Sequence, residues 1–131
     1  WELLKDGTDI AVIACGNTVY PALTAAMELE GDNIHCTVIN GRFIKPMDRE
    51  MLVSLAGRVP RILTVEENAL AGGFGAGVME VLSDEGIAIH VKRLGVPDTF
   101  LSHGSQSTLR KSLGIDKEGI KQFILKWLKT A

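Results

Sequence analysis

A cluster of glycines in the middle of the chain has the composition of a phosphate-binding loop. The segment "AGGFGAGV" (71–78) follows a strand-like run and opens a helix-like run, as the glycine-rich loops of nucleotide enzymes do. A dinucleotide loop needs G-x-G-x-x-G, however, and the glycines at 73, 75 and 77 put the third one a position early. A P-loop needs Lys followed by Ser or Thr, and no such pair directly follows the glycines.

Two acidic residues argue further against a phosphate at this cluster. Glu66 and Glu67 precede the glycines, and each carboxylate close to a pyrophosphate would cost roughly 1 kcal/mol even in a high dielectric. We therefore interpret the cluster as a packing turn, in which small residues let the start of a helix lie against a neighbouring strand or another domain.

The remaining side chains with catalytic potential form no recognisable set. His35, His90 and His103 show no metal-ligand spacing with one another or with a cysteine pair. His35 and His90 fall within strand-like runs and are interpreted as structural. Ser105 lies in "HGSQS" (103–107), but the G-x-S-x-G of a nucleophile elbow is absent and a helix follows. Ser105 is therefore predicted to be an N-cap.

Composition limits the classes of partner. The 131 residues are 46% hydrophobic and 23% charged, which is typical of one globular domain with a buried core. The net charge of -2 disfavours nucleic acid and anionic membranes as partners. We expect neither a membrane span nor a signal peptide, because no apolar run nears roughly 18 residues. Since the chain begins with "WELLKDGTD" and lacks an initial methionine, we expect 1–131 to be a fragment of a longer protein.

The cysteines bear on the compartment. Cys15 and Cys36 lie in or beside apolar, strand-like segments, and no secretion signal accompanies them. Buried and reduced thiols are therefore expected, and with them a cytoplasmic protein. A disulfide between them is the less favoured alternative.

Apolar runs and helical periodicity alternate along almost the whole chain. The patterns predict strands over 1–4, 9–14, 34–39, 61–65 and 87–94, the last at an edge, and helices over 17–30, 48–56, 74–85, 105–113 and from 116 onward. Asp48, Ser105 and Asp116 are the predicted side-chain caps. Alternation of this kind implies an α/β fold with a mostly parallel sheet between helices.

Periodicity also predicts which sides of the helices are buried. In helix 17–30 the expected buried side consists of Val19, Leu23, Ala26 and Met27, and the expected residue just past the helix is Gly31. In the last helix the residues at the spacing of one face are Ile120, Phe123, Ile124, Trp127 and Leu128.

Four motifs occur in an order that resembles a known family. They are "NGRFIKPMD" (40–48), "TVEENALAGGFGAGVMEVL" (64–82), "LGVPDTFLSHGS" (94–105) and "LGIDKEGI" (113–120). Over nearly the whole chain they resemble the C-terminal domain of 1-deoxy-D-xylulose-5-phosphate synthases, which belong to the transketolase family. "RFIKPMD" followed by "EEN" and "HGS" is more specific to these synthases than to transketolases or 2-oxoacid dehydrogenase β subunits. Gly41 departs from the family pattern, since a larger residue is expected before Arg42.

The resemblance implies a fold. It is a three-layer α/β/α sandwich, transketolase C-terminal-domain-like, around a five-stranded mixed sheet in the order 1-3-2-4-5 with strand 1 antiparallel. Right-handed crossovers then place helix 17–30 on one face and helices 48–56 and 74–85 on the other. The C-terminal helix is expected on the first face, where it would bury Trp127.

The same topology locates a candidate site at one edge of the sheet. The strand order reverses between the second and fourth strands, and ligands of open α/β sheets bind beyond the carboxyl ends of strands at such a point. Residues 15–18 and 66–73 would line this edge. We expect Arg42 or Lys45 to pair with Glu66 or Glu67, and this polar edge to face other domains of a parent enzyme. The candidate inter-domain residues are Arg42, Lys45, Glu66, Glu67 and His103.

The resemblance also implies a function for the parent enzyme. The family condenses pyruvate with glyceraldehyde 3-phosphate, releases carbon dioxide, and uses thiamine diphosphate and Mg²⁺. Its product feeds isoprenoid, thiamine and pyridoxal synthesis. The residues that hold the cofactor lie in the family's N-terminal and middle domains, so no catalytic, cofactor-binding or metal residue is carried over to this chain. We expect a domain that is inactive alone, packs on those two domains and supports a homodimer.

Two alternatives remain open. The chain could be the corresponding domain of a 2-oxoacid dehydrogenase E1 β subunit, where docking of a partner protein matters more, or of a transketolase. It could also be a free-standing module that binds a nucleotide in the crevice beyond the strand ends.

Overall fold

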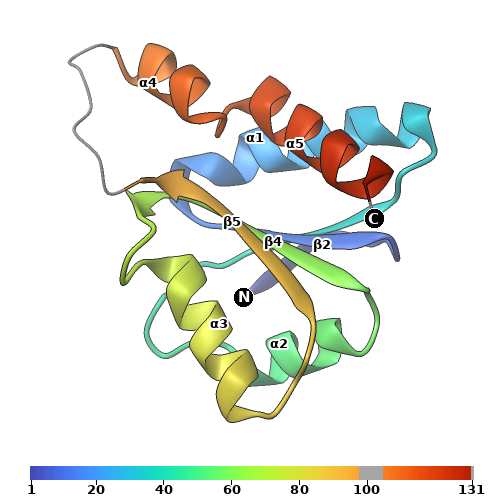
Figure 1. The fold of residues 1–131 in the computed structure, drawn as a ribbon, viewed down its shortest axis with the longest axis vertical. Helices are drawn as coiled ribbons and strands as arrows, with labels where there is room; N and C mark the ends of the chain where they lie inside the picture. Colours follow the sequence, from blue (N-terminus) through green and yellow to red (C-terminus); the bar gives the residue numbers. More distant parts are fainter. Residues whose placement is uncertain (98–104, 131) are drawn as a thin grey trace.

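The fold is built on a five-stranded sheet. In this computed structural model, which describes residues 1–97 and 105–130, the strands are β1 (Glu2–Lys5), β2 (Ile10–Ala14), β3 (Cys36–Asn40), β4 (Arg61–Ala69) and β5 (His90–Val96). Their spatial order is β1-β3-β2-β4-β5 (Figure 1). β1 runs antiparallel to β3, and the other neighbouring pairs are parallel. The expected α/β fold, strand order and edge position of β5 are confirmed.

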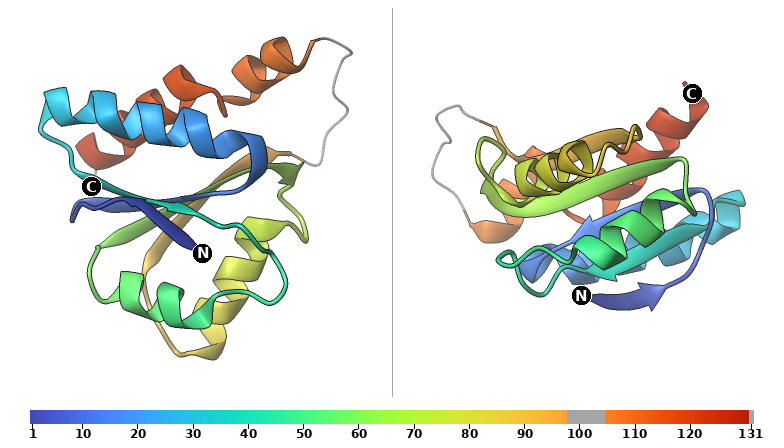
Figure 2. Two further views of the ribbon diagram at one scale, coloured as in Figure 1. Left: turned by 180° about the vertical axis from the view of Figure 1, so that it is seen from behind. Right: turned by 90° about the horizontal axis from the view of Figure 1, so that it is seen from below.

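Helices cover both faces of the sheet (Figure 1; Figure 2). One face carries α1 (Val19–Leu29), α4 (Gln106–Leu113) and α5 (Lys117–Lys129), and the other carries α2 (Arg49–Ala56) and α3 (Phe74–Asp84). Short 3-10 turns, η1 (Gly16–Thr18) and η2 (Glu30–Asp32), bracket α1. The face assignment predicted from right-handed crossovers is confirmed. Within residues 1–97 and 105–130, none of these helices combines the length and the apolarity that crossing a bilayer requires.

The central strand β2 separates two apolar cores. Its five residues are fully buried, as a continuous apolar run predicts for a strand covered on both faces. Ile10 and Val12 pack into the core beneath α1 and α5, whereas Ala11 and Ile13 pack into the core above α2 and α3. Trp127 of α5 closes the first core at 9% exposure, in agreement with its expected burial.

Side-chain caps confirm the predicted starts of three helices. Each capping oxygen accepts a hydrogen bond from the backbone N–H three residues further on: Asp48 from Met51 at 3.0 Å, Ser105 from Thr108 at 3.2 Å and Asp116 from Gly119 at 2.8 Å. These bonds satisfy amide groups that have no partner within the helix.

The first helix differs from its prediction. Its fully buried residues are Ala22, Ala25, Ala26 and Leu29, whereas Met27 is 58% exposed. Of the predicted buried side, Ala26 is fully buried, and Val19 and Leu23 pack partly buried against the core, so the prediction is wrong for Met27 alone. The helix also continues past the expected end at Gly31 into η2, after which Asn33 adopts the left-handed conformation at φ 59°.

Strand β4 is longer than predicted. The apolar run ends at Val65, but the strand continues to Ala69, so Glu66 and Glu67 belong to the strand and not to a loop. The pairing with β5 shifts register between Val65 and Ala69. The polar end of β4 therefore extends the sheet toward the candidate site.

Two residues on α1 test its observed orientation. Leu29→Ala is expected to lower the free energy of unfolding by about 2–5 kcal/mol, because it leaves a cavity in a close-packed core. Met27→Ala, on the exposed side of the same helix, should change it by less than about 0.5 kcal/mol. Urea denaturation followed by circular dichroism measures both. A larger loss for Met27→Ala would contradict the orientation seen here.

Candidate functional site

The candidate site lies beyond the carboxyl ends of β2, β3 and β4. A cavity of about 190 Å³ opens there, lined by Cys15, Gly16, Gly41, Arg42, Ile44, Glu67 and Asn68. The structure thus brings together the end of β2, the loop after β3 and the end of β4, as the topology predicts. Lys45 lines an adjacent groove of about 360 Å³, which the first turn of α3 borders on its other side.

Glu66 is a buried acid at the centre of this edge. Its side chain has no exposed area, and its two carboxylate oxygens accept hydrogen bonds from the backbone N–H groups of Phe74, at 2.7 Å, and Gly75, at 2.9 Å. Both N–H groups belong to the first turn of α3, where helix geometry leaves amides without partners and the helix dipole favours negative charge. A carboxylate of the chain itself therefore occupies the place where a nucleotide loop would hold a phosphate oxygen.

Two glycines allow the start of α3 to lie this close to β4. A Cβ atom at Gly73 would lie 2.5 Å from Oε2 of Glu66. At Gly75 it would meet the hydroxyl of Thr64 and lie 2.9 Å from Cδ of Arg93. Gly73 has a φ of -84°, so close approach and not backbone conformation is what requires glycine there. The interpretation of the cluster as a packing turn is confirmed.

The edge does not fit the diphosphate of a cofactor. The amides that could bind an anion are already held by Glu66, and a second carboxylate, Glu67, lies at the cavity wall. Among residues 1–97 and 105–130, no three His, Cys, Asp or Glu side chains gather as ligands for a metal ion. The residues at this edge offer packing contacts.

Glu67 pairs with a residue that the sequence analysis did not select. Its carboxylate forms an ion pair with Nε of Arg110 in α4 and accepts a hydrogen bond from the amide of Asn17 at 3.3 Å. The predicted pairing with Arg42 or Lys45 is not observed, since neither cation joins an ion pair within the part of the chain that the structure describes. Arg110 lies 43 residues from Glu67, on a short helix. No sequence motif near either residue predicts this ion pair.

Cys15 forms an unreactive part of the cavity wall. It is 8% exposed, and burial, followed by the negative charges of Glu66 and Glu67, raises the pKa of its thiol to about 11. The thiol therefore stays protonated at neutral pH and is a poor nucleophile. Both cysteines of the chain are buried and free, as expected.

The loop after β3 presents apolar side chains to solvent. Phe43 is 51% exposed and Ile44 is 41% exposed. Arg42 and Lys45, which flank them in the sequence, are exposed as well. Neighbouring apolar side chains with a polar rim are typical of a surface that contacts another protein part. We call residues 42–45 the exposed loop.

Gly41 anchors the exposed loop to the core. Its N–H donates to the carbonyl of Ala14 at 2.8 Å. A Cβ atom at this position would lie 2.7 Å from the ring of Phe74, the first residue of α3. Gly41 therefore leaves room for a buried aromatic ring.

The histidines take no part in this cavity within the described residues. His103 lies outside those residues. His35 precedes β3, and its exposed ring lies 3.3 Å from Oδ1 of Asn33. His90 is the exposed first residue of β5, at the opposite end of the sheet.

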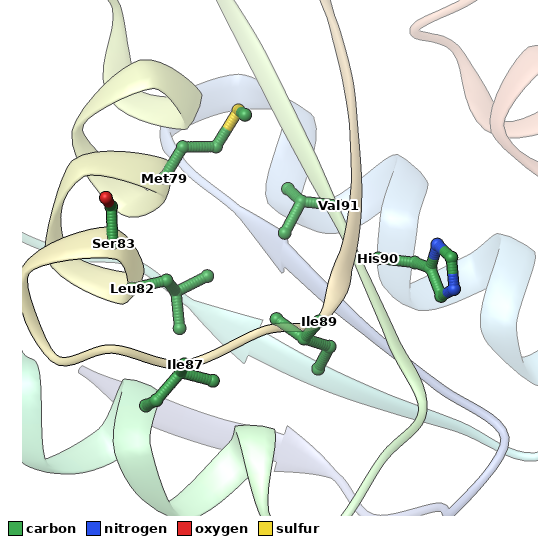
Figure 3. A pocket seen from close by; sticks show the side chains of 7 residues that line it. All are labelled: Met79, Leu82, Ser83, Ile87, Ile89, His90 and Val91. Carbon is green, nitrogen blue, oxygen red and sulfur yellow. The ribbon is translucent and has the colours of Figure 1, made fainter.

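A second groove lies between α3 and β5. It encloses about 400 Å³ and is lined by Met79, Leu82, Ser83, Ile87, Ile89, His90 and Val91 (Figure 3). Leu82 and Val91 point into the space between the helix and the edge strand, whereas His90 points to the other side of β5 (Figure 3). Five of the seven lining residues have apolar side chains.

Comparison with known proteins gives consistent matches. The family model described as "Transketolase, C-terminal domain" matches residues 1–120. A 1-deoxy-D-xylulose-5-phosphate synthase 1 from Geobacter sulfurreducens is 55% identical over 120 residues, 91% of this chain and 19% of that protein. The 1-deoxy-D-xylulose-5-phosphate synthase of Aquifex aeolicus is 48% identical over 129 residues, 98% of this chain and 20% of that protein. The chain thus spans about a fifth of the length of these relatives.

A solved structure shares the fold closely. It is described as a split gene transketolase in an inactive beta4 tetramer, and it matches with a TM-score of 0.88 at 34% identity. The match covers 95% of this chain and 41% of that one.

Replacing the buried acid tests its role in holding α3. Glu66→Gln keeps the size of the side chain but turns an NH₂ group toward an N–H donor, so the free energy of unfolding should fall by about 1–3 kcal/mol. Glu67→Gln, which breaks a partly exposed ion pair, should cost less than about 1 kcal/mol. Equal losses in chemical denaturation would show that burial of Glu66 is not decisive.

Glycine-to-alanine exchanges test the close approach of α3. Gly75→Ala should destabilise the chain by about 1–3 kcal/mol, because the new methyl group overlaps the hydroxyl of Thr64. At Gly31, in the 3-10 turn η2, no heavy atom of the described residues lies within 4 Å of an added Cβ. Gly31→Ala should therefore stabilise by about 0.4–1 kcal/mol. Thermal unfolding of the two variants should move in opposite directions, and a common direction would contradict the packing described.

Proposed function

The chain belongs to the transketolase C-terminal domain family, and on that premise we propose that it is the C-terminal domain of a 1-deoxy-D-xylulose-5-phosphate synthase. The identities of 55% and 48% to two such synthases, each over more than nine-tenths of this chain, support the proposal. The parent enzyme would condense pyruvate with glyceraldehyde 3-phosphate and release carbon dioxide. Thiamine diphosphate and Mg²⁺, held by its other domains, would supply the carbanion chemistry.

The role proposed for this chain is to brace those other domains. The observation that carries it is the exposed loop, where Phe43 and Ile44 lie open to solvent beside two cations. This loop sits at the strand ends next to a start of α3 that Glu66 holds in place, so the apolar contact is presented on a rigid support. The proposed partners are the N-terminal and middle domains of the parent and, through them, a homodimer. Arg42, Lys45, Glu67 and His103 remain proposed inter-domain contacts. Glu66, predicted with them, is fully buried and bonded within the chain, so it is not proposed as a contact.

The alternatives receive less support. The reported relatives at the highest identities are synthases, whereas the split gene transketolase is 34% identical. A free-standing nucleotide module is disfavoured because Glu66 already holds the amides of α3 that would bind a phosphate. A cytoplasmic location is part of the proposal and is supported by the two free, buried thiols.

A pair of double variants tests the bracing role. Phe43→Ser with Ile44→Ser should change the free energy of unfolding of the 131-residue chain by less than about 0.5 kcal/mol, because both side chains are exposed there. In the full-length parent the same variant should lower the rate of condensation of pyruvate with glyceraldehyde 3-phosphate by about tenfold or more, because apolar contacts to other domains are lost.

The matched control lies on the opposite layer of the sandwich. Tyr20→Ser with Met27→Ser also replaces two exposed apolar side chains, at 74% and 58% exposure, and should leave the activity of the parent unchanged. Equal activities of the two double variants would contradict the assignment of the exposed loop. Condensation by the 131-residue chain alone would overturn the bracing role.

A further inference from the structure

A further pocket, separate from the cavity and grooves described above, lies at the opposite end of the sheet from the exposed loop. It encloses about 510 Å³ and is lined by Arg61, His90, Lys92, Trp127 and Thr130. Arg61 and His90 are the first residues of β4 and β5 and lie opposite each other in the pairing of these strands. Trp127 and Thr130 come from the end of α5. The pocket is therefore formed by two strand ends and one helix end, all on the α1 and α5 face.

The cations in this pocket lack acceptors. Nε and Nη1 of Arg61 are buried and have no hydrogen-bond partner among residues 1–97 and 105–130, although buried guanidinium donors are normally satisfied. Within residues 1–97 and 105–130, neither Arg61 nor Lys92 forms an ion pair with a carboxylate. Unsatisfied donors and neighbouring positive charges both oppose folding, so this arrangement calls for an anion.

Both cations of the pocket lie against the ring of Trp127. Cζ of Arg61 lies 5.4 Å from the centroid of the Trp127 ring, and Nζ of Lys92 lies 5.3 Å from it. Nζ of Lys92 also lies 5.8 Å from the ring centroid of Phe123. Such contacts hold a cation in place but supply no acceptor for its N–H groups. The ring provides no oxygen acceptor.

The carbonyl groups at the end of α5 accept no hydrogen bond from Nε or Nη1 of Arg61 either. Its last carbonyls would attract a cation. Thr130 serves them instead: its N–H donates to the carbonyl of Trp127 at 3.3 Å, and its hydroxyl lies 3.1 Å from that oxygen and 3.2 Å from the carbonyl of Lys126. The hydroxyl and N–H of Thr130 therefore satisfy these carbonyl groups without Arg61.

His90 adds a third basic side chain to the same pocket. Its ring points away from the groove that Val91 faces, toward the other side of β5 (Figure 3). From the unpaired guanidinium, the lysine and this imidazole, we infer that the pocket binds a dianionic oxyanion, of the kind carried by phosphate monoesters. Several oxygens on one centre can accept from all three side chains, and the double negative charge matches two permanent cations.

The site is independent of the bracing role proposed for the exposed loop. Arg61 begins β4, whereas Glu66 and Glu67 lie toward its carboxyl end. The pocket lining includes none of Arg42, Lys45 and Glu67, the described residues proposed for inter-domain contact. Binding here can therefore be measured on the 131-residue chain and fails or succeeds separately from the function of the parent.

Tryptophan fluorescence gives a local readout of this pocket. In a Trp1→Phe background the remaining tryptophan is Trp127, and titration with inorganic phosphate at constant ionic strength should give a saturable change. The expected dissociation constant is about 1 mM or tighter. Lys92→Gln should weaken binding about tenfold, and Arg61→Gln should abolish the saturable change.

Two comparisons make the result decisive. Lys126→Gln removes an exposed charge from the same helix without touching the pocket lining, and it should change the affinity by less than about twofold. Acetate, with one negative charge, should bind more weakly than phosphate. The inference is overturned by the absence of a saturable change, by equal weakening in Lys126→Gln and Lys92→Gln, or by acetate binding as tightly as phosphate. Circular dichroism of each variant confirms that the fold is retained.

Discussion

The bond between Glu66 and the first turn of α3 is the contact on which this end of the molecule depends. A fully buried carboxylate meets two backbone N–H groups that helix geometry leaves without partners, and each supplies what the other lacks. The bond needs the helix start to lie very close to β4, and Gly73 and Gly75 permit that distance. It also fills an anion-binding position with a group of the chain itself, which turns a potential ligand loop into a rigid joint. Phe74, held by the same bond, occupies the space that Gly41 leaves open.

The two ends of the sheet differ in how their buried charged groups are hydrogen-bonded. At the carboxyl ends of the strands the buried acid is satisfied internally, and what remains exposed is an apolar loop suited to contact with other domains. At the amino ends the opposite holds, because Nε and Nη1 of Arg61 are buried without an acceptor among the residues that the structure describes. A buried carboxylate that is hydrogen-bonded within the chain stabilises the local structure, whereas buried guanidinium donors without an acceptor favour binding of an anion. The same parallel strands therefore carry the proposed bracing surface at one end and the candidate anion site at the other.

Much of the architecture could be predicted because it rests on local chemistry. Apolar runs located the buried strands, and Asp48 and Asp116 were recognisable as caps, since a short polar side chain before an amphipathic run satisfies the first amides of a helix. The strand order came from resemblance to a family. Periodicity failed on α1, where it placed Met27 inside, because close packing of alanines against the sheet outweighs the hydrophobicity of one exposed side chain.

The sequence by itself determined the elements, their caps and the absence of a complete phosphate-loop motif, all of which depend on residues a few positions apart. Only the tertiary structure decided how the charges are partnered. Glu67 meets Arg110, 43 residues away, and Arg61 comes to lie beside Trp127, because the packing of α4 and α5 sets those distances. Electrostatic pairing falls off with separation in space and is indifferent to separation along the chain. For that reason the pairing of Arg42 or Lys45 with an acid, expected from the topology of the strands, is not observed among the described residues, and Glu67 pairs with Arg110 of α4 instead.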